Sequence, residues 1–493
     1  MADQGRNGEK CGPRAIILAR LLRLLCEEGI LEPSRKSPVV RFQHPDKLQE
    51  ILSLEPEAQG VHMNEILHLC HDIVKYSVQT CHPHFKNQLY GGIDPYGLAG
   101  AWLAEALNTN IHTYEVAPVF VLVECAVLRH VLNIAGFPNG DGIFAPGGSM
   151  SNMYGMVLAR YKAVPDSKMK GLSGLPPLVA FTSEDGHYSV KKAAHWLGIG
   201  TENVVAVKTD SHGRMMPSRL TCCIQQAIAE GKKPFFVSAT AGTTVLGAFD
   251  PLEQIADICH QYGLWLHVDA CWGGTLMLSK KHCHCLKGLE RADSVAWNPH
   301  KMLGAPLQCA LFLTKEKGLM HHCNSASASY LFQQDKFYDV SFDTGDKSVQ
   351  CGRKVDAFKL WLMWKAHGSN GFESLINNAM DASRYFKEAI QVQPGFRLVL
   401  DEFECTNVCF WFIPPSLRGQ EENDEWWNKI HTVAPKIKER LILSGTLMIG
   451  YQPLPHKGLR NFFRFVTSCH PPPTYADMDH VWQEIERLGA DLW

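Results

Sequence analysis

The chain has 493 residues, 45% of them hydrophobic, and its 48 basic and 50 acidic residues nearly cancel. This charge balance gives no reason to expect nucleic acid or an anionic membrane as a partner. Charged residues interrupt the most apolar stretches, residues 15–25 and 116–132, so neither predicts a membrane span. Residues 1–14 lack the apolar core of a secretory signal, and the 17 cysteines form no small-domain disulfide pattern. We therefore expect a cytoplasmic protein with reduced thiols.

The beginning of the chain is predicted to be a helical segment, residues 1–95. Within it, residues 15–27 and 63–76 repeat apolar positions at helical spacing. A loop-like stretch, residues 82–92, follows these helices and is dense in polar side chains.

The middle of the chain, residues 96–367, alternates strand-like with helix-like patterns. We expect strands at 178–182, 204–207, 235–239, 264–268, 294–297 and 309–314, and helices at 190–197, 220–229 and 252–262. Short, uniformly apolar strands that alternate with helices predict an α/β fold with a mostly parallel sheet covered on both faces.

The pattern changes after about residue 368. Residues 372–390 are predicted to be helical, and residues 397–413 and 447–466 to form strands or hairpins. We therefore expect residues 368–493 to form a separate, smaller α+β domain.

Two charged residues stand at the ends of predicted strands. Lys301 follows the strand at 294–297, and a lysine in an apolar pocket or beside another cation can attack a carbonyl. Taken alone, a loop lysine is usually a solvated surface residue. Asp269 ends a fully apolar strand, where an acid either meets a ligand or caps the next helix, and its position does not decide between the two.

Three further segments carry polar groups after predicted strands. Gly147, Gly148 and Ser149 precede a helix, as in phosphate-binding turns, although the spacing of dinucleotide sites and P-loops is absent and a simple capping turn has the same pattern. His187 could stack on an aromatic cofactor or lie on the surface, and Thr243 offers a hydroxyl. Because the carboxyl ends of parallel strands meet at one edge of a sheet, all five segments are predicted to converge on one ligand site.

Taken in order, these segments carry a family resemblance. The motifs are Pro-Gly-Gly-Ser-x-Ser-Asn from residue 146, Glu-x-x-His-Tyr-Ser from 184, Ala-Thr-Ala-Gly-Thr-Thr-Val-x-Gly-Ala-Phe-Asp-Pro from 239, His-Val-Asp-Ala-x-Trp-Gly-Gly from 267, and Asn-Pro-His-Lys from 298. Together they resemble the group II decarboxylases that depend on pyridoxal 5′-phosphate (PLP). Within that group the chain is similar to the acidic branch, which contains cysteine sulfinate decarboxylase, aspartate 1-decarboxylase and, more distantly, glutamate decarboxylase.

The resemblance extends from about residue 82 to 492 and implies the aspartate-aminotransferase fold (type I), with PLP bound in the large domain. It also implies a homodimer whose two active sites lie at the interface. The cofactor residues that it implies are Lys301, which carries PLP as a Schiff base, Asp269 at the pyridine nitrogen, His187 stacked on the ring, Thr243 near the phenolic oxygen, Gly148 and Ser149 at the phosphate, and Asn298 and His300 beside the lysine.

The resemblance also implies substrate-side residues. Tyr338 matches a mobile-loop tyrosine that returns a proton to the α-carbon, Arg464 matches an arginine that binds a substrate carboxylate, and Asn87 and Gln88 match a segment that selects the side chain. Lys86 stands where relatives carry an apolar residue. It could add positive charge near the acidic substrate or point to solvent, and we favour solvent.

The activity implied is decarboxylation of a small acidic amino acid, namely cysteine sulfinate to hypotaurine or aspartate to β-alanine. A bulky Tyr90 would shorten the substrate pocket and favour these substrates, although one methylene discriminates by only about 1–3 kcal/mol. Glutamate decarboxylation to GABA, an aminotransferase and an inactive scaffold remain alternatives. The His/Cys tract at residues 282–285 is too tightly spaced for a tetrahedral zinc site of its own, and we predict no metal.

Overall fold

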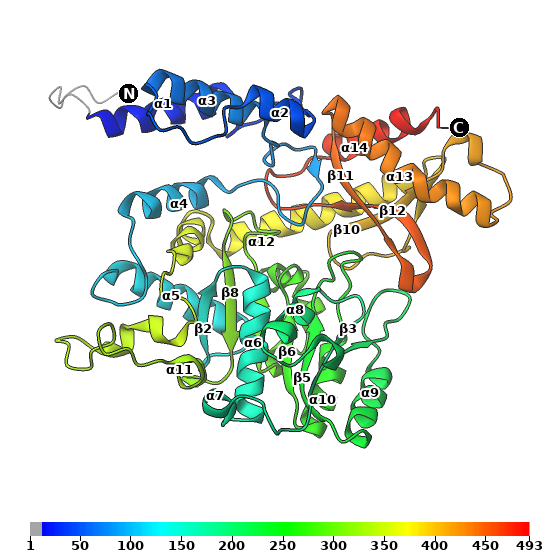
Figure 1. Cartoon of the computed structure of the whole chain (residues 1–493). Coiled ribbons are helices and arrows are strands. Elements are labelled where there is room, and N and C mark those ends of the chain that lie inside the picture. The colour runs from blue at the N-terminus through cyan, green and yellow to red at the C-terminus, as the bar shows by residue number, and fades with distance from the viewer. Residues whose placement is uncertain (1–11, 493) are drawn as a thin grey trace.

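The computed structural model describes residues 12–492, and these form two β-sheets that share the long helix α12 (Asp356–Gln391) (Figure 1). The seven-stranded sheet lies in the lower half of Figure 1, and the five-stranded sheet lies at the upper right. Within residues 12–492, no helix has the length and apolar character needed to cross a membrane.

The larger sheet has the strand order β2-β8-β7-β6-β5-β3-β4. Its strands are β2 (Asp141–Ala145), β3 (Leu178–Ser183), β4 (Val204–Val207), β5 (Lys233–Thr240), β6 (Trp265–Asp269), β7 (Ser294–Trp297) and β8 (Ala310–Thr314). Only β8 pairs antiparallel with its neighbours, so the predicted mostly parallel sheet is confirmed. All six predicted strands are present, and β2 is a strand that we did not predict.

Helices cover both faces of this sheet, because its strands are apolar on both sides. In β3, Val179 and Phe181 pack into one hydrophobic cluster, while Leu178 and Ala180 pack into another on the opposite face. The first cluster contains side chains of α5 (Pro118–Ile134), α9 (Pro217–Ala229), α10 (Leu252–Tyr262) and α12. The second contains side chains of α6 (Gly148–Ala163), α8 (Ser189–Trp196) and α11 (Leu319–Asn324).

The smaller sheet has the order β1-β11-β12-β10-β9. Its strands are β1 (Phe85–Lys86), β9 (Phe396–Leu398), β10 (Asn407–Phe412), β11 (Met448–Leu454) and β12 (Leu459–Val466). A third hydrophobic cluster joins it to α13 (Asp424–Ser444), α14 (Tyr475–Gly489) and the second half of α12. Residues 85–86 therefore add a parallel strand to the sheet of the predicted small domain, across the boundary that we drew at residue 95. The division into three domains stays a prediction.

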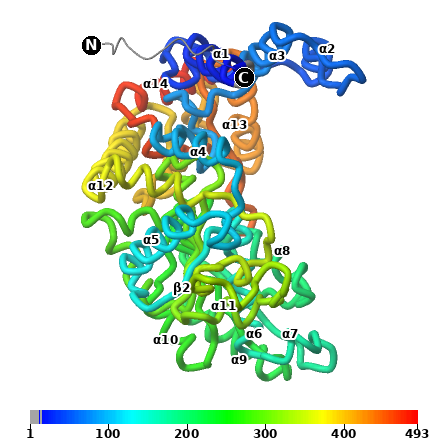
Figure 2. Tube along the Cα trace, turned by 90° about the vertical axis from the view of Figure 1, so that its left-hand side faces the viewer, coloured from blue at the N-terminus to red at the C-terminus, as the bar shows by residue number. Residues whose placement is uncertain are grey.

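The remaining helices are α1 (Pro13–Glu27), α2 (Pro45–Ile51), α3 (Met63–Tyr76), α4 (Pro95–Leu107) and α7 (Ser167–Lys170). Helices α1 to α3 lie along the top of the molecule, and Figure 2 shows α2 and α3 extending beyond the body.

Helix α12 is interrupted at Gly368, whose backbone has φ 64° and ψ 176°. This conformation is open almost only to glycine, because a side chain there strains the backbone. The interruption coincides with the point at which the sequence pattern changed, so a single glycine redirects the helix between the two sheets.

We expect Gly368→Ala to lower the free energy of unfolding by about 1–3 kcal/mol, the cost of forcing a side chain into this conformation. Denaturant unfolding followed by circular dichroism measures it. Gly352→Ala is the matched control, since a methyl group there also meets open space but the backbone has no positive φ. Equal destabilisation by the two substitutions would contradict the strain argument.

Candidate active site

A pocket of about 200 Å³ opens at the carboxyl ends of β3, β5, β6 and β7. It is lined by Gly148, Ser149, Asn152, His187, Tyr188, Thr240, Gly242, Thr244, Asp269, Cys271, Trp272, Asn298, His300 and Lys301. Of the predicted cofactor residues, only Thr243 is absent from this lining. The structure thus brings together segments that are up to 153 residues apart in the sequence, as the strand-end argument predicted.

Asp269 is a buried carboxylate at the bottom of this site. Burial alone would raise the pKa of Asp269, but the positive charge of Lys301 opposes this effect. Two hydrogen bonds add to it, from Asn152 Nδ2 at 2.8 Å and from the Cys271 backbone N–H at 3.1 Å. The pKa of Asp269 therefore lies below its ordinary value, and the group stays ionised near neutral pH.

A chain of hydrogen bonds behind Asp269 fixes the orientation of Asn152. Trp265 Nε1 donates to Ser294 Oγ at 2.8 Å, and the Ser294 hydroxyl, 2.9 Å from His267 Nδ1, can donate to that nitrogen. Burial lowers the pKa of His267 to about 4, so the ring is neutral and its proton is on Nε2, 2.9 Å from Asn152 Oδ1. The amide nitrogen of Asn152 must then face the other way, where it donates to Asp269 and to Ser189 Oγ.

The same chain extends to His187. Ser189 Oγ accepts from Asn152 and lies 2.8 Å from His187 Nδ1, and the Ser189 backbone N–H donates to the same nitrogen at 3.3 Å. His187 Nδ1 is therefore an acceptor, which assigns its ring proton to Nε2. Burial also lowers the pKa of His187, consistent with a neutral ring in this position.

The glycine-rich turn forms the start of α6. Gly147 has φ 99°, and no side chain caps the N–H groups that follow it. A Cβ atom on Gly148 would lie 2.5 Å from Asn298 Nδ2 and 2.5 Å from Cys271 Sγ, so glycine is required there. Free N–H groups at a helix N-terminus suit a phosphate.

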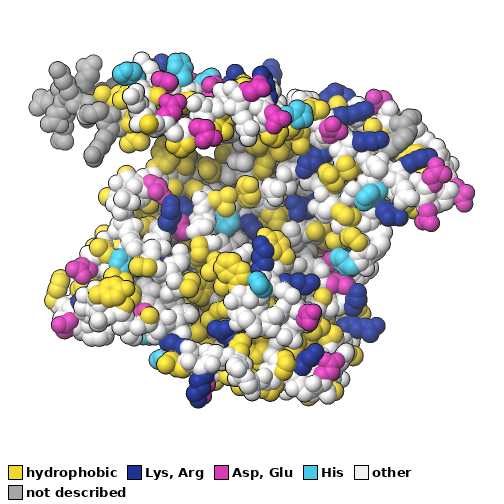
Figure 3. Space-filling view, in the orientation of Figure 1, with side chains coloured by type: hydrophobic (Ala, Val, Ile, Leu, Met, Phe, Trp, Pro, Cys, Tyr) yellow, Lys and Arg dark blue, Asp and Glu magenta, His cyan; other side chains and the backbone are white. Residues whose placement is uncertain are grey.

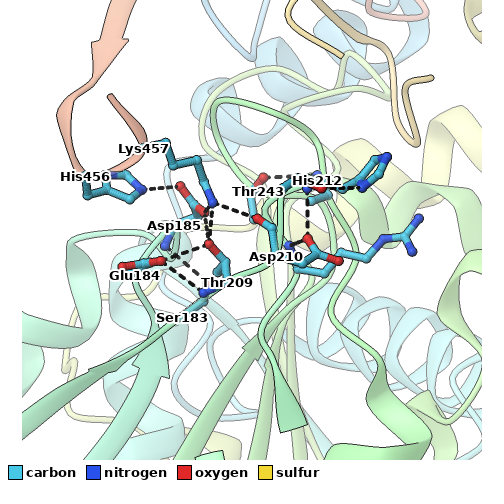
Figure 4. Close-up of polar contacts among 12 residues, drawn as sticks. Ser183, Glu184, Asp185, Thr209, Asp210, His212, Thr243, His456 and Lys457 are labelled. Atoms are coloured by element: carbon cyan, nitrogen blue, oxygen red, sulfur yellow. Dashed lines mark hydrogen bonds and ion pairs between the residues drawn. The ribbon is translucent and has the colours of Figure 1, made fainter. Parts of the chain in front are cut away.

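Ion pairs and hydrogen bonds from the small domain hold the segment that precedes His187. Figure 4 shows His456 and Lys457, between β11 and β12, reaching Asp185. His456 Nε2 lies 2.9 Å from Asp185 Oδ1, and Lys457 Nζ lies 3.2 Å from Asp185 Oδ2 and 2.5 Å from Thr209 Oγ1. We call Asp185, Thr209, His456 and Lys457 the interdomain clamp. It holds the loop two residues before His187.

Arg464, on β12, is not among the residues that line the pocket, but it bonds to Thr244, which is. Its Nη1 donates to the Thr244 carbonyl at 3.0 Å and its Nη2 to the Asn87 carbonyl at 3.1 Å, while Lys438 Nζ donates to Asn87 Oδ1 at 2.8 Å. The Arg464 side chain is 8% exposed, and its Nε has no hydrogen-bond partner among the described residues. Burial lowers the pKa of Arg464, which means that the site holds a costly positive charge.

Four other predicted residues lie differently. The Thr243 hydroxyl accepts from the Ala248 backbone N–H at 3.0 Å, and its neighbour Thr244 lines the pocket instead. Tyr338 OH donates to Asp343 Oδ1 at 2.9 Å, on a loop outside the pocket. Gln88 and Tyr90 are exposed, Tyr90 to 38%, and neither lines the pocket.

The prediction that Lys86 points to solvent is wrong. Lys86 is only 5% exposed, and burial lowers its pKa to about 8. It pairs with Ile449 in the core of the small domain, and its Nζ lies 5.8 Å from the Phe465 ring. Because successive residues of a strand point to opposite faces, the Phe465 side chain lies on the face away from Arg464. Lys86 is therefore inside the small domain.

Residues 45–413 match the model of the pyridoxal-dependent decarboxylase conserved domain. The chain belongs to the pyridoxal-dependent decarboxylase family. It is 55% identical to acidic amino acid decarboxylase GADL1 of Bos taurus (95% of this chain, 90% of the relative) and 52% identical to human cysteine sulfinic acid decarboxylase (97% and 96%). A crystal structure of mouse CSAD superimposes with a TM-score of 0.94 at 50% identity, covering 98% of this chain and 100% of that one. The predicted family and type I fold are confirmed.

The pocket of this decarboxylase fits PLP. Asp269 offers an ionised carboxylate to a pyridinium nitrogen, Lys301 offers an amine, and the start of α6 offers N–H groups to a phosphate. Asn298 Oδ1 is buried without a hydrogen-bond partner among the described residues, so the pocket contains an acceptor that the protein leaves unsatisfied.

Sequence reasoning missed several residues of this site. Asn152, Cys271 and Thr244 all lie inside the quoted motifs but received no role. Asn152 could have been found, because it is a polar residue at the end of a turn of the phosphate-binding type. His267 gave no such signal, because a histidine within an apolar strand is ordinarily a core residue.

We expect Asn152→Ala to weaken PLP binding by about 5- to 150-fold, since a buried carboxylate that loses a hydrogen bond costs about 1–3 kcal/mol. Titration of the apoenzyme with PLP, followed by absorbance, measures the affinity. Asn203→Ala removes an amide that bonds only to a backbone carbonyl elsewhere in the large domain and should leave the affinity unchanged. Unaltered PLP affinity in Asn152→Ala would show that Asp269 does not depend on this amide.

Proposed function

We propose that this decarboxylase acts on a small acidic amino acid, converting cysteine sulfinate to hypotaurine, aspartate to β-alanine, or both. The observation that carries the proposal is Arg464, a buried cation that bonds to the backbone of the pocket residue Thr244 and has no acidic hydrogen-bond partner among the described residues. A planar guanidinium that already donates to two carbonyls is held in a fixed orientation, in which it can donate further hydrogen bonds to a carboxylate or a sulfinate. The names of the similar proteins, cysteine sulfinic acid decarboxylase and acidic amino acid decarboxylase, support the same substrate class.

The pocket residues have distinct roles in this proposal. Bound PLP supplies the electron sink for the pair left behind when carbon dioxide departs. Lys301 would bind the cofactor covalently, and Asp269 would keep a proton on its ring nitrogen. The neutral His187 would lie against the ring, and Gly148 and Ser149 would bind the phosphate.

Proton return to the α-carbon is assigned to Tyr338, as the family resemblance implies. In the single chain, the Tyr338 hydroxyl bonds to Asp343 and its ring lies 5.2 Å from that of Tyr114. The loop that bears it projects beyond α11 at the left of Figure 1. Tyr338 therefore needs a loop movement, or the pocket of a second chain, to reach a substrate. Closure of such a loop would also exclude water.

The length of the substrate is the least constrained part of the proposal. Tyr90 is exposed in the single chain, so it can shorten the pocket only if a second chain or a bound substrate brings it inward. Asn87 is better placed, since its carbonyl bonds to Arg464 and its side chain bonds to Lys438. Glutamate, which is one methylene longer than aspartate, stays the alternative substrate.

A decarboxylation panel tests the substrate. Purified protein with PLP is offered cysteine sulfinate, aspartate and glutamate separately, and the products are identified by mass. We expect hypotaurine or β-alanine to form faster than GABA, by about 5- to 150-fold in kcat/KM if the pocket discriminates by one methylene. Faster GABA formation would overturn the short-substrate proposal, and the absence of any amine would favour an inactive scaffold.

Two lysine variants serve as controls for this panel. Lys301→Ala should abolish the absorbance of covalently bound PLP and all amine formation. Lys281→Ala removes an exposed lysine paired with Asp381 and should change neither.

We also propose a homodimer with the active sites at its interface. The N-terminal helices expose apolar side chains, among them Leu18 and Leu22 on α1 and Ile66 and Ile73 on α3. Figure 3 shows hydrophobic side chains lining the hollow beneath these helices. Exposed apolar patches of this kind mark interaction surfaces.

We expect the protein to have twice the mass of its 55.1 kDa chain in solution, and the double variant Leu18→Asp/Leu22→Asp to dissociate, because charges would be buried at the interface. Size-exclusion chromatography with light scattering measures the mass. Leu443→Asp, at an exposed leucine of α13, is the control. A wild-type protein that stays monomeric at all concentrations would contradict the dimer.

The location in the cell is a further part of the proposal. The sixteen cysteines within residues 12–492 are free thiols. Free thiols are the usual state in a reducing compartment, which supports a cytoplasmic protein.

A further inference from the structure

Three metal-ligand side chains from distant parts of the chain meet beside the Lys301 loop. Asp94 precedes α4, His367 lies on α12 next to the Gly368 interruption, and His470 follows β12. One ligand atom from each lies within 4.8 Å of the other two. Helices α4 and α12 run next to each other in both Figure 1 and Figure 2.

The three side chains are arranged around one point. Asp94 Oδ2 lies 2.5 Å from His367 Nε2 and 3.4 Å from His470 Nε2. Asp94 is fully buried, and its other oxygen accepts from the Gly97 backbone N–H at 2.8 Å. His470 is 7% exposed, and its Nε2 has no hydrogen-bond partner among the described residues although it faces the carboxylate. A buried, unpartnered nitrogen of this kind needs a reason, because leaving it unsatisfied costs about 1–3 kcal/mol.

We propose that Asp94, His367 and His470 bind a zinc ion. Zinc takes histidine nitrogen at about 2.0–2.1 Å and carboxylate oxygen at about 2.0–2.2 Å, which places tetrahedral ligands about 3.3 Å apart. Asp94 Oδ2 and His470 Nε2 already have this separation. The distance from Asp94 to His367 is that of a hydrogen bond, and it lengthens when zinc replaces the proton between them.

The surroundings suit a zinc ion held by three protein ligands and one water. His367 is the only ligand with appreciable exposure, so solvent reaches the fourth position from its side. The hydrogen bond from Gly97 orients the carboxylate, as outer-shell partners do in metal sites. The same ligand set also occurs in iron(II) oxygenases, but those need several open positions for substrates, and two of these three ligands are buried.

The site would connect the domains at the catalytic lysine. The Asp94 backbone N–H donates to the Gly304 carbonyl at 2.9 Å, and the Gly304 N–H donates to the Lys301 carbonyl at 3.2 Å. A Cβ atom on Gly304 would lie 2.6 Å from the His470 ring, so the loop packs directly against a ligand. Zinc therefore ties α4, α12 and the loop after β12 to the loop that carries Lys301.

Zinc content tests the proposal on the holoenzyme. The protein is desalted to remove free PLP, which chelates metals, then incubated with ZnCl₂, dialysed, and analysed for metal. We expect one zinc per chain and a higher melting temperature with zinc than with a chelator. Wild-type protein that retains no zinc overturns the proposal.

Three variants locate the ion. His470→Asn and His367→Gln should each lower the affinity for zinc by more than roughly 10- to 100-fold, because the loss of an outer-shell partner alone costs that much. His367→Gln keeps an N–H that can donate to Asp94, and unchanged PLP absorbance in both variants shows that they fold. His284→Gln, in the exposed His/Cys tract, is the control and should keep zinc. Zinc lost in His284→Gln but kept in His470→Asn would place the ion in that tract and refute the site.

Discussion

The burial of one ionised carboxylate is the constraint on which the site depends. Removing Asp269 from water would by itself protonate it, and a protonated acid could not hold a proton on a pyridine nitrogen. The structure opposes this with the positive charge of Lys301 and with two N–H donors. One of those donors, Asn152, is held in this orientation by His267, which bonds to its oxygen. The ionisation of Asp269 therefore depends in part on hydrogen bonds within the large sheet.

The second requirement is that Asp269, Lys301 and His187 keep their positions relative to one another. The parallel strands place Asp269 and Lys301 at one edge of the large sheet, whereas His187 lies on the loop between β3 and α8, outside the sheet. The interdomain clamp supplies that support from the small domain. Arg464 bonds to the pocket residue Thr244 from the small domain, so a movement between the domains would displace His187 and Arg464 together.

Much of this could be predicted from the sequence, for identifiable reasons. Strands buried on both faces are uniformly apolar, so six of the seven large-sheet strands were found, and their ends located Lys301, Asp269 and His187. The missed strand β2 contains a charged residue and a glycine, and it pairs with β8, which is distant in sequence. The Asn152–His267 bond joins residues 115 positions apart, and Asp94 is still farther in sequence from His367 and His470, so no local pattern encodes these contacts.

Lys86 shows why a residue's neighbours in sequence are a poor guide to its role. It precedes Asn87, which bonds to Arg464, yet the alternation of a strand sends the two side chains to different environments. Its register with Ile449 places the Lys86 side chain among core residues, where burial lowers its pKa. A cation on that face cannot contact a substrate at Arg464. We therefore attribute recognition of the acidic side chain to Arg464, with Lys438 bonding to Asn87, and not to Lys86.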